Sequence, residues 1–387
     1  MQKYVFTLLI VTFIGGCVSI KPPPGDSIPV VERSAQPDES KRLFSVFLVG
    51  DAGDASLDPL EPSLSLLREK VQQAGENSAV VFLGDNVYPH GLPEKDHRKR
   101  KRAEDRLRAQ FKSVENYSGQ VVFLSGNHDW NSSRKKGLEA VQRQEKFVEQ
   151  SLNRGNVFLP DDGKPGPAVV KLDNGDFDMS ILALNTQWWL HPHQKPGAET
   201  EDEYESRKKQ VIQNLKEAVA DTSANQVLVV GHHPMYSNGI NGGKFPLKTH
   251  LLPPVGGSLY VFYRNIFGTS QDISSRKYEK LKEQLTSVFA ERNPLIYASG
   301  HDHSLQYITF DDDRRNQHYV ISGSATVTSY VRPPELPSFG IQQKGFSVLH
   351  YYEKAIWVEF WSEGGKRLFE QKITPVHQNN WKKINKE

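Results

Sequence analysis

A single cysteine, Cys17, occurs in the 387 residues of this chain. One cysteine forms neither an internal disulfide nor a site of several thiolates, so disulfide scaffolds and thiolate metal clusters are excluded. The charges nearly cancel, with 48 lysines and arginines against 46 aspartates and glutamates. This balance predicts no broad electrostatic field for nucleic acid, and no nucleic-acid partner is expected. A hydrophobic fraction of 37% with 10% aromatic residues argues against general disorder and indicates a globular chain.

The N-terminus accounts for the cysteine. Lys3 is followed by an apolar run at residues 4–14, which is too short to span a bilayer comfortably. Ile14-Gly15-Gly16-Cys17 resembles the bacterial lipobox, in which the cysteine is lipidated and becomes the first residue of the mature protein. Val18 after the cysteine, instead of aspartate, resembles lipoproteins that are sent to the outer membrane. An ordinary signal peptide with an incidental cysteine and a buried apolar helix are the alternatives.

Four segments follow from these patterns. Residues 1–16 are expected to be a lipoprotein signal peptide, and residues 17–41 are a tether rich in proline and polar residues. Residues 42–375 form the globular domain, and residues 376–387 are a polar C-terminal tail. Acyl chains on Cys17 would attach the domain to the bacterial cell envelope, with the outer membrane as the expected location.

Five hydrophobic segments of the domain end in glycine and a side chain that can bind metal. They are residues 43–49 before Gly50-Asp51-Ala52-Gly53, 79–83 before Gly84-Asp85-Asn86, 121–124 before Gly126-Asn127-His128-Asp129, 227–230 before Gly231-His232-His233, and 295–298 before Gly300-His301-Asp302-His303. Such runs predict buried strands. In an α/β sheet, sites gather outside the carboxyl ends of strands, which is where these motifs stand.

Charged segments with helical periodicity lie between these strands. The predicted helices are residues 62–73, 98–112, 136–153, 203–220 and 273–291. This alternation predicts an α/β sheet that carries the five motifs. From residue 169 the pattern is more purely β, and the segments 168–172, 177–185, 307–310, 319–322, 346–352 and 356–361 predict a second sheet packed on the first.

The motifs supply oxygen and imidazole donors without any thiolate. The candidate metal ligands are Asp51, Asp85, Asn127, His232, His301 and His303. This mixture suits Zn, Mn or Fe. A carboxylate can bind two ions through its two oxygens, so Asp85, in the middle of the set, is expected to bridge them.

In this order the five motifs resemble those of the calcineurin-like metallophosphoesterases. Most members have histidine where this chain has Gly53, whereas purple acid phosphatases have glycine there and a tyrosine three residues after the bridging aspartate, as Tyr88 is here. The resemblance is strongest to the small, tartrate-resistant type and covers roughly residues 43–360. It implies an α/β fold, a four-layer α/β/β/α sandwich of two mixed sheets flanked by helices.

The resemblance also implies two metal ions. The first would be held by Asp51, Asp85, Tyr88 and His303, and the second by Asp85, Asn127, His232 and His301. A phenolate favours ferric iron, so the first ion is expected to be Fe(III) and the protein to be coloured. The second would be Fe(II), Zn(II) or Mn(II).

A two-metal site of this kind implies hydrolysis of a phosphoester by a metal-bound hydroxide. His128 is expected to act as general acid or electrostatic stabiliser, with Asp129 orienting its imidazole. Substrate contacts are expected from Asn127, His128, Asn241 and His233. The family usually has a histidine at the position of Asn241, and asparagine does not deliver a proton. Acid assistance then rests on His128, unless His233 or His250 supplies it.

Two further features have two interpretations each. The basic segment at residues 95–102 either steers anionic substrates or starts a solvated helix with its own ion pairs. Trp188 and Trp189 either line the pocket mouth or pack between elements.

The expected protein is therefore a lipid-anchored, dinuclear phosphomonoesterase that acts on a phosphorylated small molecule. A phosphodiesterase or nucleotide pyrophosphatase on the same site, and a non-catalytic binding lipoprotein, are the alternatives. The sequence leaves open the substrate, the second metal, the pH optimum, the face of the membrane and the oligomeric state.

Overall fold

The computed structural model describes residues 37–193, 195–221, 223–244, 271–312, 315–332, 334 and 338–374. The predicted signal peptide, the lipidation site Cys17, most of the tether and the tail at residues 376–387 lie outside the described residues, as does His250. The last tether residues form a single 3-10 turn, η1 (Glu39–Lys41). Among the helices that are described, none has both the length and the apolar character needed to cross a membrane.

The first sheet combines parallel and antiparallel strands in the order β13-β12-β11-β1-β2-β3. Its parallel part consists of β1 (Phe44–Val49), β2 (Ser78–Phe82) and β3 (Gln120–Phe123). The antiparallel part consists of β11 (Gly345–Tyr352), β12 (Ala355–Ser362) and β13 (Arg367–Ile373). Chain segments about 300 residues apart therefore pair directly, as in the match of Phe44 with Tyr351.

The second sheet is also mixed and has the order β10-β8-β9-β7-β6-β5-β4. Its parallel strands are β5 (Asp178–Leu184), β6 (Gln226–Gly231), β7 (Leu295–Ser299) and β9 (Arg315–Ser322). The antiparallel strands are β4 (Ala168–Asp173), β8 (Leu305–Asp312) and β10 (Phe339–Ile341).

The strands divide between the sheets differently from the sequence prediction. One sheet was expected for all five motif-bearing strands, but β1, β2 and β3 lie in the first sheet and β6 and β7 in the second. The prediction that the late β segments share the second sheet is wrong for β11 and β12, because β11 pairs with β1 of the first sheet and β12 pairs with β11. A buried strand has the same hydrophobic pattern in either sheet, so its partner depends on contacts distant in sequence.

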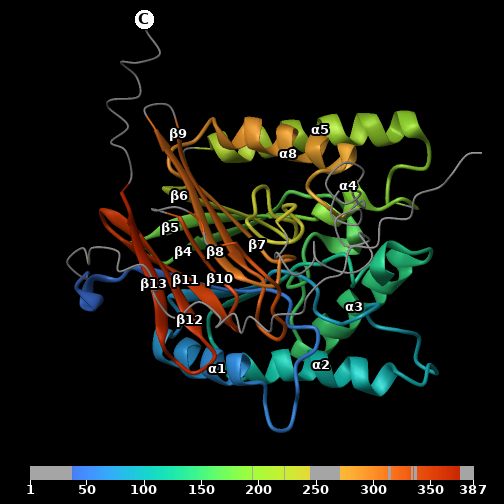
Figure 1. The fold of residues 1–387 in the computed structure, drawn as a ribbon, viewed down its shortest axis with the longest axis horizontal. Helices are drawn as coiled ribbons and strands as arrows, with labels where there is room; N and C mark the ends of the chain where they lie inside the picture. Colours follow the sequence, from blue (N-terminus) through green and yellow to red (C-terminus); the bar gives the residue numbers. More distant parts are fainter. Residues whose placement is uncertain are drawn as a thin grey trace, which may run out of the picture. The chain divides into compact units, whose positions relative to one another are not determined.

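Helices cover the outer faces of the two sheets (Figure 1). The first sheet packs against α1 (Pro62–Ala74), α2 (Arg100–Ser113) and α3 (Gly137–Leu152). The second packs against α5 (Glu201–Ala220), α8 (Arg276–Phe289) and the short α4 (Thr186–Leu190). The predicted four-layer α/β/β/α sandwich is thus confirmed.

Local sequence explains where these helices lie. Pro62 occupies the start of α1, where its missing N–H would be unpaired in any case, and Leu64, Leu67 and Val71 form one buried face. Thr200 and Glu203 form a reciprocal capping box at the start of α5. Each helix therefore presents one apolar stripe to its sheet.

Aromatic rings join the inner faces of the sheets. Phe339 of β10 stacks on Phe369 of β13 with ring centroids 4.6 Å apart, and it contacts Phe360 of β12 at 5.2 Å. The strand ends that carry the motifs also meet. The Gly50 N–H donates to the Ser322 carbonyl at 2.7 Å, and the Gly300 N–H donates to the His232 carbonyl at 3.0 Å. Loops from both sheets are thereby brought to one place.

Candidate metal centre

Three of the predicted ligands have a left-handed backbone. The φ angles are +60° at Asp51, +54° at Asp85 and +68° at His301. Residues other than glycine rarely adopt this conformation, and when they do the surrounding structure has to hold them there. The preceding Gly84 leaves no room for a side chain, since a Cβ would lie 2.7 Å from the Gly126 nitrogen and 2.8 Å from Nδ1 of His232. The strand ends are thus shaped to direct ligands rather than to continue regular structure.

Asp51, Tyr88 and His303 form the first group of donors. The Tyr88 hydroxyl donates to Oδ1 of Asp51 at 2.8 Å and lies 3.0 Å from Nε2 of His303. The same His303 nitrogen is 3.4 Å from Oδ1 of Asp51. Three donor atoms from three different loops therefore converge on one point.

Asn127, His232 and His301 form the second group. Oδ1 of Asn127 lies 3.1 Å from Nε2 of His232 and 3.0 Å from Nδ1 of His301, and the two nitrogens are 3.3 Å apart. His232 directly follows β6 of the second sheet and Asn127 lies in the loop after β3 of the first, so this group joins the two sheets.

Asp85 lies between the two groups. Its Oδ2 is 3.4 Å from Nε2 of His232, and its Oδ1 accepts the His128 backbone N–H at 2.8 Å. Asp51, Asp85 and His232 offer ligand atoms that all lie within 4.8 Å of one another. All seven predicted metal ligands are thus brought together, with Asp85 in the position expected of a bridge.

This donor set fits two metal ions. Ligands bound about 2.1 Å from one cation at right angles are about 3 Å apart, which is the spacing within each group. Asp51 and Asp85 are buried, and no lysine or arginine of the described residues comes within 4.0 Å of either carboxylate. Buried carboxylates without a lysine or arginine partner are typical of a metal site.

The electrostatics show how strongly these groups interact without a metal. Burial opposes ionisation of Asp85, but the His232 and His128 imidazoles outweigh it and hold the pKa of Asp85 far below its ordinary value. Burial likewise opposes the charge on His232, yet Asp85 raises the pKa of His232 to about 9. Burial and the neighbouring His232 lower the pKa of His301 to about 3. Asp85 and His232 therefore form an ion pair that a metal would replace.

Backbone carbonyls orient the two imidazoles of the second group. Nδ1 of His232 donates to the Leu83 carbonyl at 2.9 Å, and Nε2 of His301 donates to the Gln271 carbonyl at 3.1 Å. Since a carbonyl can only accept, the other nitrogen of each ring is left as a metal ligand. Sequence reasoning did not identify Gln271, because it stands in no motif.

His128 is positioned by other residues than expected. Its Nδ1 donates to the Pro89 carbonyl at 2.6 Å and lies 3.2 Å from the Ser132 hydroxyl, while Nε2 is 3.8 Å from Oδ2 of Asp85. The side chain is 29% exposed, and its ring meets the Tyr88 ring edge to face at 4.6 Å. Nε2 is therefore the atom that can exchange a proton with a bound molecule.

The prediction that Asp129 orients His128 is wrong. The Asp129 carboxylate is fully buried and accepts from the Gly126 N–H at 2.8 Å, the Asn86 N–H at 3.0 Å and the Gln144 side-chain amide at 2.8 Å. These bonds tie the loop of Asp85 to the loop of Asn127. Asp129 is thus a positioning residue for two ligand loops.

The predicted substrate contact of His233 is also contradicted. This side chain is fully buried, with Nδ1 2.7 Å from the Thr186 hydroxyl and Nε2 2.7 Å from Oε1 of Gln271. Asn241 lies beside the last ligand loop, where its N–H donates to Oδ1 of Asp302 at 3.3 Å. A substrate contact from the Asn241 side chain stays a prediction.

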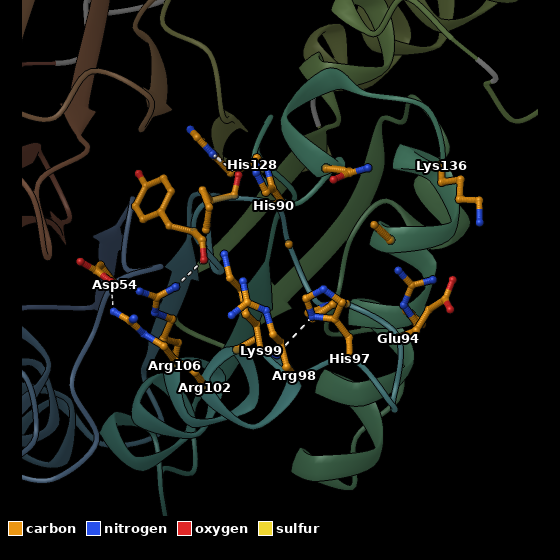
Figure 2. A pocket seen from close by; sticks show the side chains of 18 of the residues that line it. Asp54, His90, Glu94, His97, Arg98, Lys99, Arg102, Arg106, His128 and Lys136 are labelled. Carbon is orange, nitrogen blue, oxygen red and sulfur yellow. Dashed lines mark hydrogen bonds and ion pairs between the residues drawn. The ribbon is translucent and has the colours of Figure 1, made fainter.

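A cavity of about 1140 Å³ opens beside the metal centre. Its lining includes Tyr88, His128 and His303 and residues of the basic segment. Figure 2 shows Arg98, Lys99 and Arg102 of that segment apart from His128. Trp188 and Trp189 are not at its mouth, because both are buried in the core of the second sheet and pack on each other at 5.4 Å.

Both interpretations of the basic segment are partly supported. Arg100 pairs with Glu104 at 2.7 Å and Lys101 with Asp105 at 2.8 Å along α2, as in a solvated helix start. Arg98, Lys99 and Arg102 line the cavity instead.

Comparisons with known proteins agree with this geometry. The family model described as "Calcineurin-like phosphoesterase" matches residues 44–305. Tartrate-resistant acid phosphatase type 5 of Oryctolagus cuniculus is 25% identical over 349 residues, which cover 84% of this chain and 89% of that protein. Purple acid phosphatase 3 of Arabidopsis thaliana is 24% identical over 183 residues, which cover 46% of this chain but only 37% of the plant protein.

One solved structure shows the same fold at a similar size. It is described as GAP50, the anchor in the inner membrane complex of Plasmodium, and it matches with a TM-score of 0.51 and 16% identity, covering 87% of this chain and 90% of that chain. At this identity the likeness concerns the fold alone.

Proposed function

The chain belongs to the calcineurin-like phosphoesterase family, and on this premise we propose that it is a two-metal phosphohydrolase that cleaves phosphomonoesters. The observation that supports this most directly is the convergence of seven donors in two groups, with Asp85 between them. The relative among the tartrate-resistant acid phosphatases spans nearly the whole domain, which favours the monoester reaction.

The chain's own residues have separable tasks in this reaction. When two ions are bound, they supply Lewis acidity and a water of lowered pKa. His128 lines the cavity, and its Nε2, 3.8 Å from Oδ2 of Asp85, delivers a proton to the leaving oxygen, while the Pro89 carbonyl keeps the proton of Nδ1 in place. Asp129 keeps the loops of Asp85 and Asn127 at a constant separation. Catalysis in this scheme depends on fixed positions rather than on a covalent intermediate.

The first group of donors is proposed to hold Fe(III). Asp51 and Tyr88 are hard oxygen donors, and the hydroxyl of Tyr88 already lies 2.8 Å from Asp51 and 3.0 Å from His303. Burial and Asp51 raise the pKa of the Tyr88 phenol well above its ordinary value, so a strongly charged ion is needed to displace its proton. The second group, with one amide and two imidazoles, is proposed to hold Fe(II), Zn(II) or Mn(II).

Attachment of the domain to the bacterial outer membrane through a lipid on Cys17 is part of the same proposal. It is supported by the lipobox-like sequence that ends at Cys17 and by the proline-rich stretch after it. Incorporation of labelled palmitate into the wild-type chain, and its loss in Cys17→Ser, is the expected result. Palmitate incorporation that persists in Cys17→Ser would contradict the assignment of Cys17 as the lipidation site.

Parallel assays decide between the proposed reaction and its rivals. Full-length protein, purified in detergent and analysed for metals, is given phenyl phosphate and diphenyl phosphate at equal concentration. Two transition-metal ions per chain and faster release of phenol from the monoester are expected. Faster turnover of the diester would favour the phosphodiesterase, and metal-free, inactive protein would favour a binding lipoprotein.

A further inference from the structure

The cavity beside the metal centre is much larger than a phosphate group needs. Its volume of about 1140 Å³ compares with the roughly 300–1,000 Å³ of pockets that hold whole small molecules. Tyr88, His128 and His303 border the cavity, so a phosphoester held at the metal centre would extend its leaving group into it. The other residues that line the cavity would therefore contact the leaving group.

That lining carries an excess of positive charge. Its cations are Arg98, Lys99, Arg102, Arg106, Lys136 and Arg143, and its carboxylates are Asp54, Glu94 and Asp96. Figure 2 shows His128 and His90 on one side of the cavity, and Arg98, Lys99 and Arg106 on another. Cations that share a concave wall raise the local potential more than the same charges on an open surface.

Some of these cations are already paired and others are not. Arg106 is largely buried and bonds to Asp54 and to the Tyr88 carbonyl, so it serves mainly to attach α2 to a ligand loop. By contrast, no carboxylate of the described residues lies within 4.0 Å of the side-chain nitrogens of Arg98, Lys99 or Lys136. These three side chains are available to an anion.

We propose that this cavity binds a second anionic group of the substrate, so that the preferred substrates are phosphomonoesters whose leaving group carries another phosphate or a carboxylate. The inference rests on the proposed function, since it needs a phosphoester at the metal centre. It extends that function by assigning the substrate class from Arg98 and Lys99, which directly precede α2 and line the cavity beside the site.

Matched substrates test the second anion directly. Hexanediol bisphosphate, 6-hydroxyhexyl phosphate and 6-phosphonooxyhexanoate share a six-carbon chain with a phosphate at one end and differ in the group at the other end. Analogues with four-carbon and eight-carbon chains vary the distance between the two end groups. After correction for its two equivalent ends, the bisphosphate is expected to have a kcat/KM at least about tenfold above that of the hydroxyl compound, mainly through KM. The carboxylate compound shows whether the site requires phosphate or accepts any anion.

A matched pair of variants separates the effect of the cations that line the cavity from the effect of the positive charge of the whole basic segment. Arg98→Ala/Lys99→Ala removes two cavity cations, whereas Lys95→Ala/Lys101→Ala removes two cations from the same segment that do not line the cavity. The first variant is expected to lose at least about fivefold of the preference for the bisphosphate, and the second to keep it. The preference is a ratio within one sample, so partial unfolding of a variant cancels.

The outcomes distinguish this inference from the proposed function. Equal kcat/KM for the bisphosphate and hydroxyl compounds in wild-type protein, or an equal loss of preference in both variants, overturns the second site and leaves the phosphomonoesterase intact. If no phosphomonoester is hydrolysed, the proposed function fails. Calorimetric binding of hexanediol bisphosphate and 6-hydroxyhexyl phosphate to wild-type protein and to both variants then tests whether the cavity binds the second anion. The bisphosphate is expected to bind more tightly than the hydroxyl compound to wild-type protein and to Lys95→Ala/Lys101→Ala, and to lose this advantage in Arg98→Ala/Lys99→Ala.

Discussion

Asp85 and Glu359 are buried carboxylates associated with the same sheet: Asp85 lies in the loop after β2, and Glu359 lies within β12. Glu359 accepts from the Arg367 guanidinium at 2.9 Å and from the Trp361 indole at 2.9 Å, with His350 at 3.6 Å. Asp85 has a backbone N–H and imidazoles as partners, and the nearest imidazole belongs to another candidate ligand. The protein neutralises Glu359 with its own arginine, whereas Asp85 has no arginine or lysine partner among the described residues and is left for an ion.

This difference separates a structural charge from a functional one. Burial opposes ionisation of Glu359, but His350 and Arg367 outweigh it and lower the pKa of Glu359 to about 2. The resulting cluster is complete within the fold. The cluster around Asp85 is completed only by a ligand, which is why buried acids without an arginine or lysine nearby mark the site.

The largest effect is expected from Asp85→Asn. Loss of the bridging carboxylate should remove both ions and lower kcat by at least about a thousandfold, because both halves of the centre share this residue. The metal-free protein should also become less stable, because the substitution removes the anionic partner of the buried His232. Metal analysis, phosphate release and urea unfolding check this. Retention of two ions would contradict the bridging role.

Glu359→Gln should lower stability but, unlike Asp85→Asn, leave the metal content unchanged. The pKa of about 2 in the folded state lies below the ordinary 4.5, so the ionised carboxylate stabilises the fold above pH 4.5, and this contribution is lost as the pH falls from 4.5 towards 2. At neutral pH the substitution should cost about 3 kcal/mol. Urea unfolding of both proteins across this range should show the difference closing on the acid side. A stability difference between the two proteins that does not vary with pH would contradict the stabilising role of the ionised Glu359 carboxylate.

His128→Asn tests proton delivery at the edge of the metal cluster. A loss of about a hundredfold is expected with phenyl phosphate, whose leaving group needs a proton. With p-nitrophenyl phosphate the loss should be much smaller, because that leaving group departs as a stable anion. Metal content should stay at the wild-type value. An equal loss with both substrates would show that His128 only binds the phosphate.

Tyr88→Phe should have the smallest effect on rate, within about tenfold, and the clearest effect on colour. The substitution removes one donor from the first group and leaves Asp51, Asp85 and His303 in place. The visible absorption of wild-type protein should disappear, and the second group should keep its ion. A colourless wild-type protein with two zinc ions would remove the Fe(III) assignment and leave the hydrolase intact.

Features that depend on neighbours in the chain were predictable. The strand expected at residues 43–49 is β1 at Phe44–Val49, and the helix expected at 62–73 is α1 at Pro62–Ala74. The helix expected at 273–291 is shorter, because the Ser275 side chain caps its first turn by accepting from the Tyr278 N–H. The short β10 and the charged β13 were not predicted, since neither contains a hydrophobic run long enough to indicate a strand.

Partners distant in the chain were not predictable. Asp129 stands next to His128 in sequence, yet its carboxylate bonds to Gly126, Asn86 and Gln144. The carbonyl that holds the His128 imidazole belongs to Pro89, 39 positions away. A motif shows which side chains are available but not which of them will meet once the loops fold.

The sequence by itself determined which seven donors are present and that each stands at or shortly after a strand end, because a hydrophobic run, a glycine and a polar side chain are read from adjacent residues. Only the tertiary structure decided that β6 and β7 leave the sheet of β1 and β2 and still bring their ligands to the same centre. It also decided that Arg98 and Lys99 line the cavity beside that centre. The physical reason is that strand pairing, desolvation and ion pairing depend on groups far apart in the chain, which no local pattern encodes.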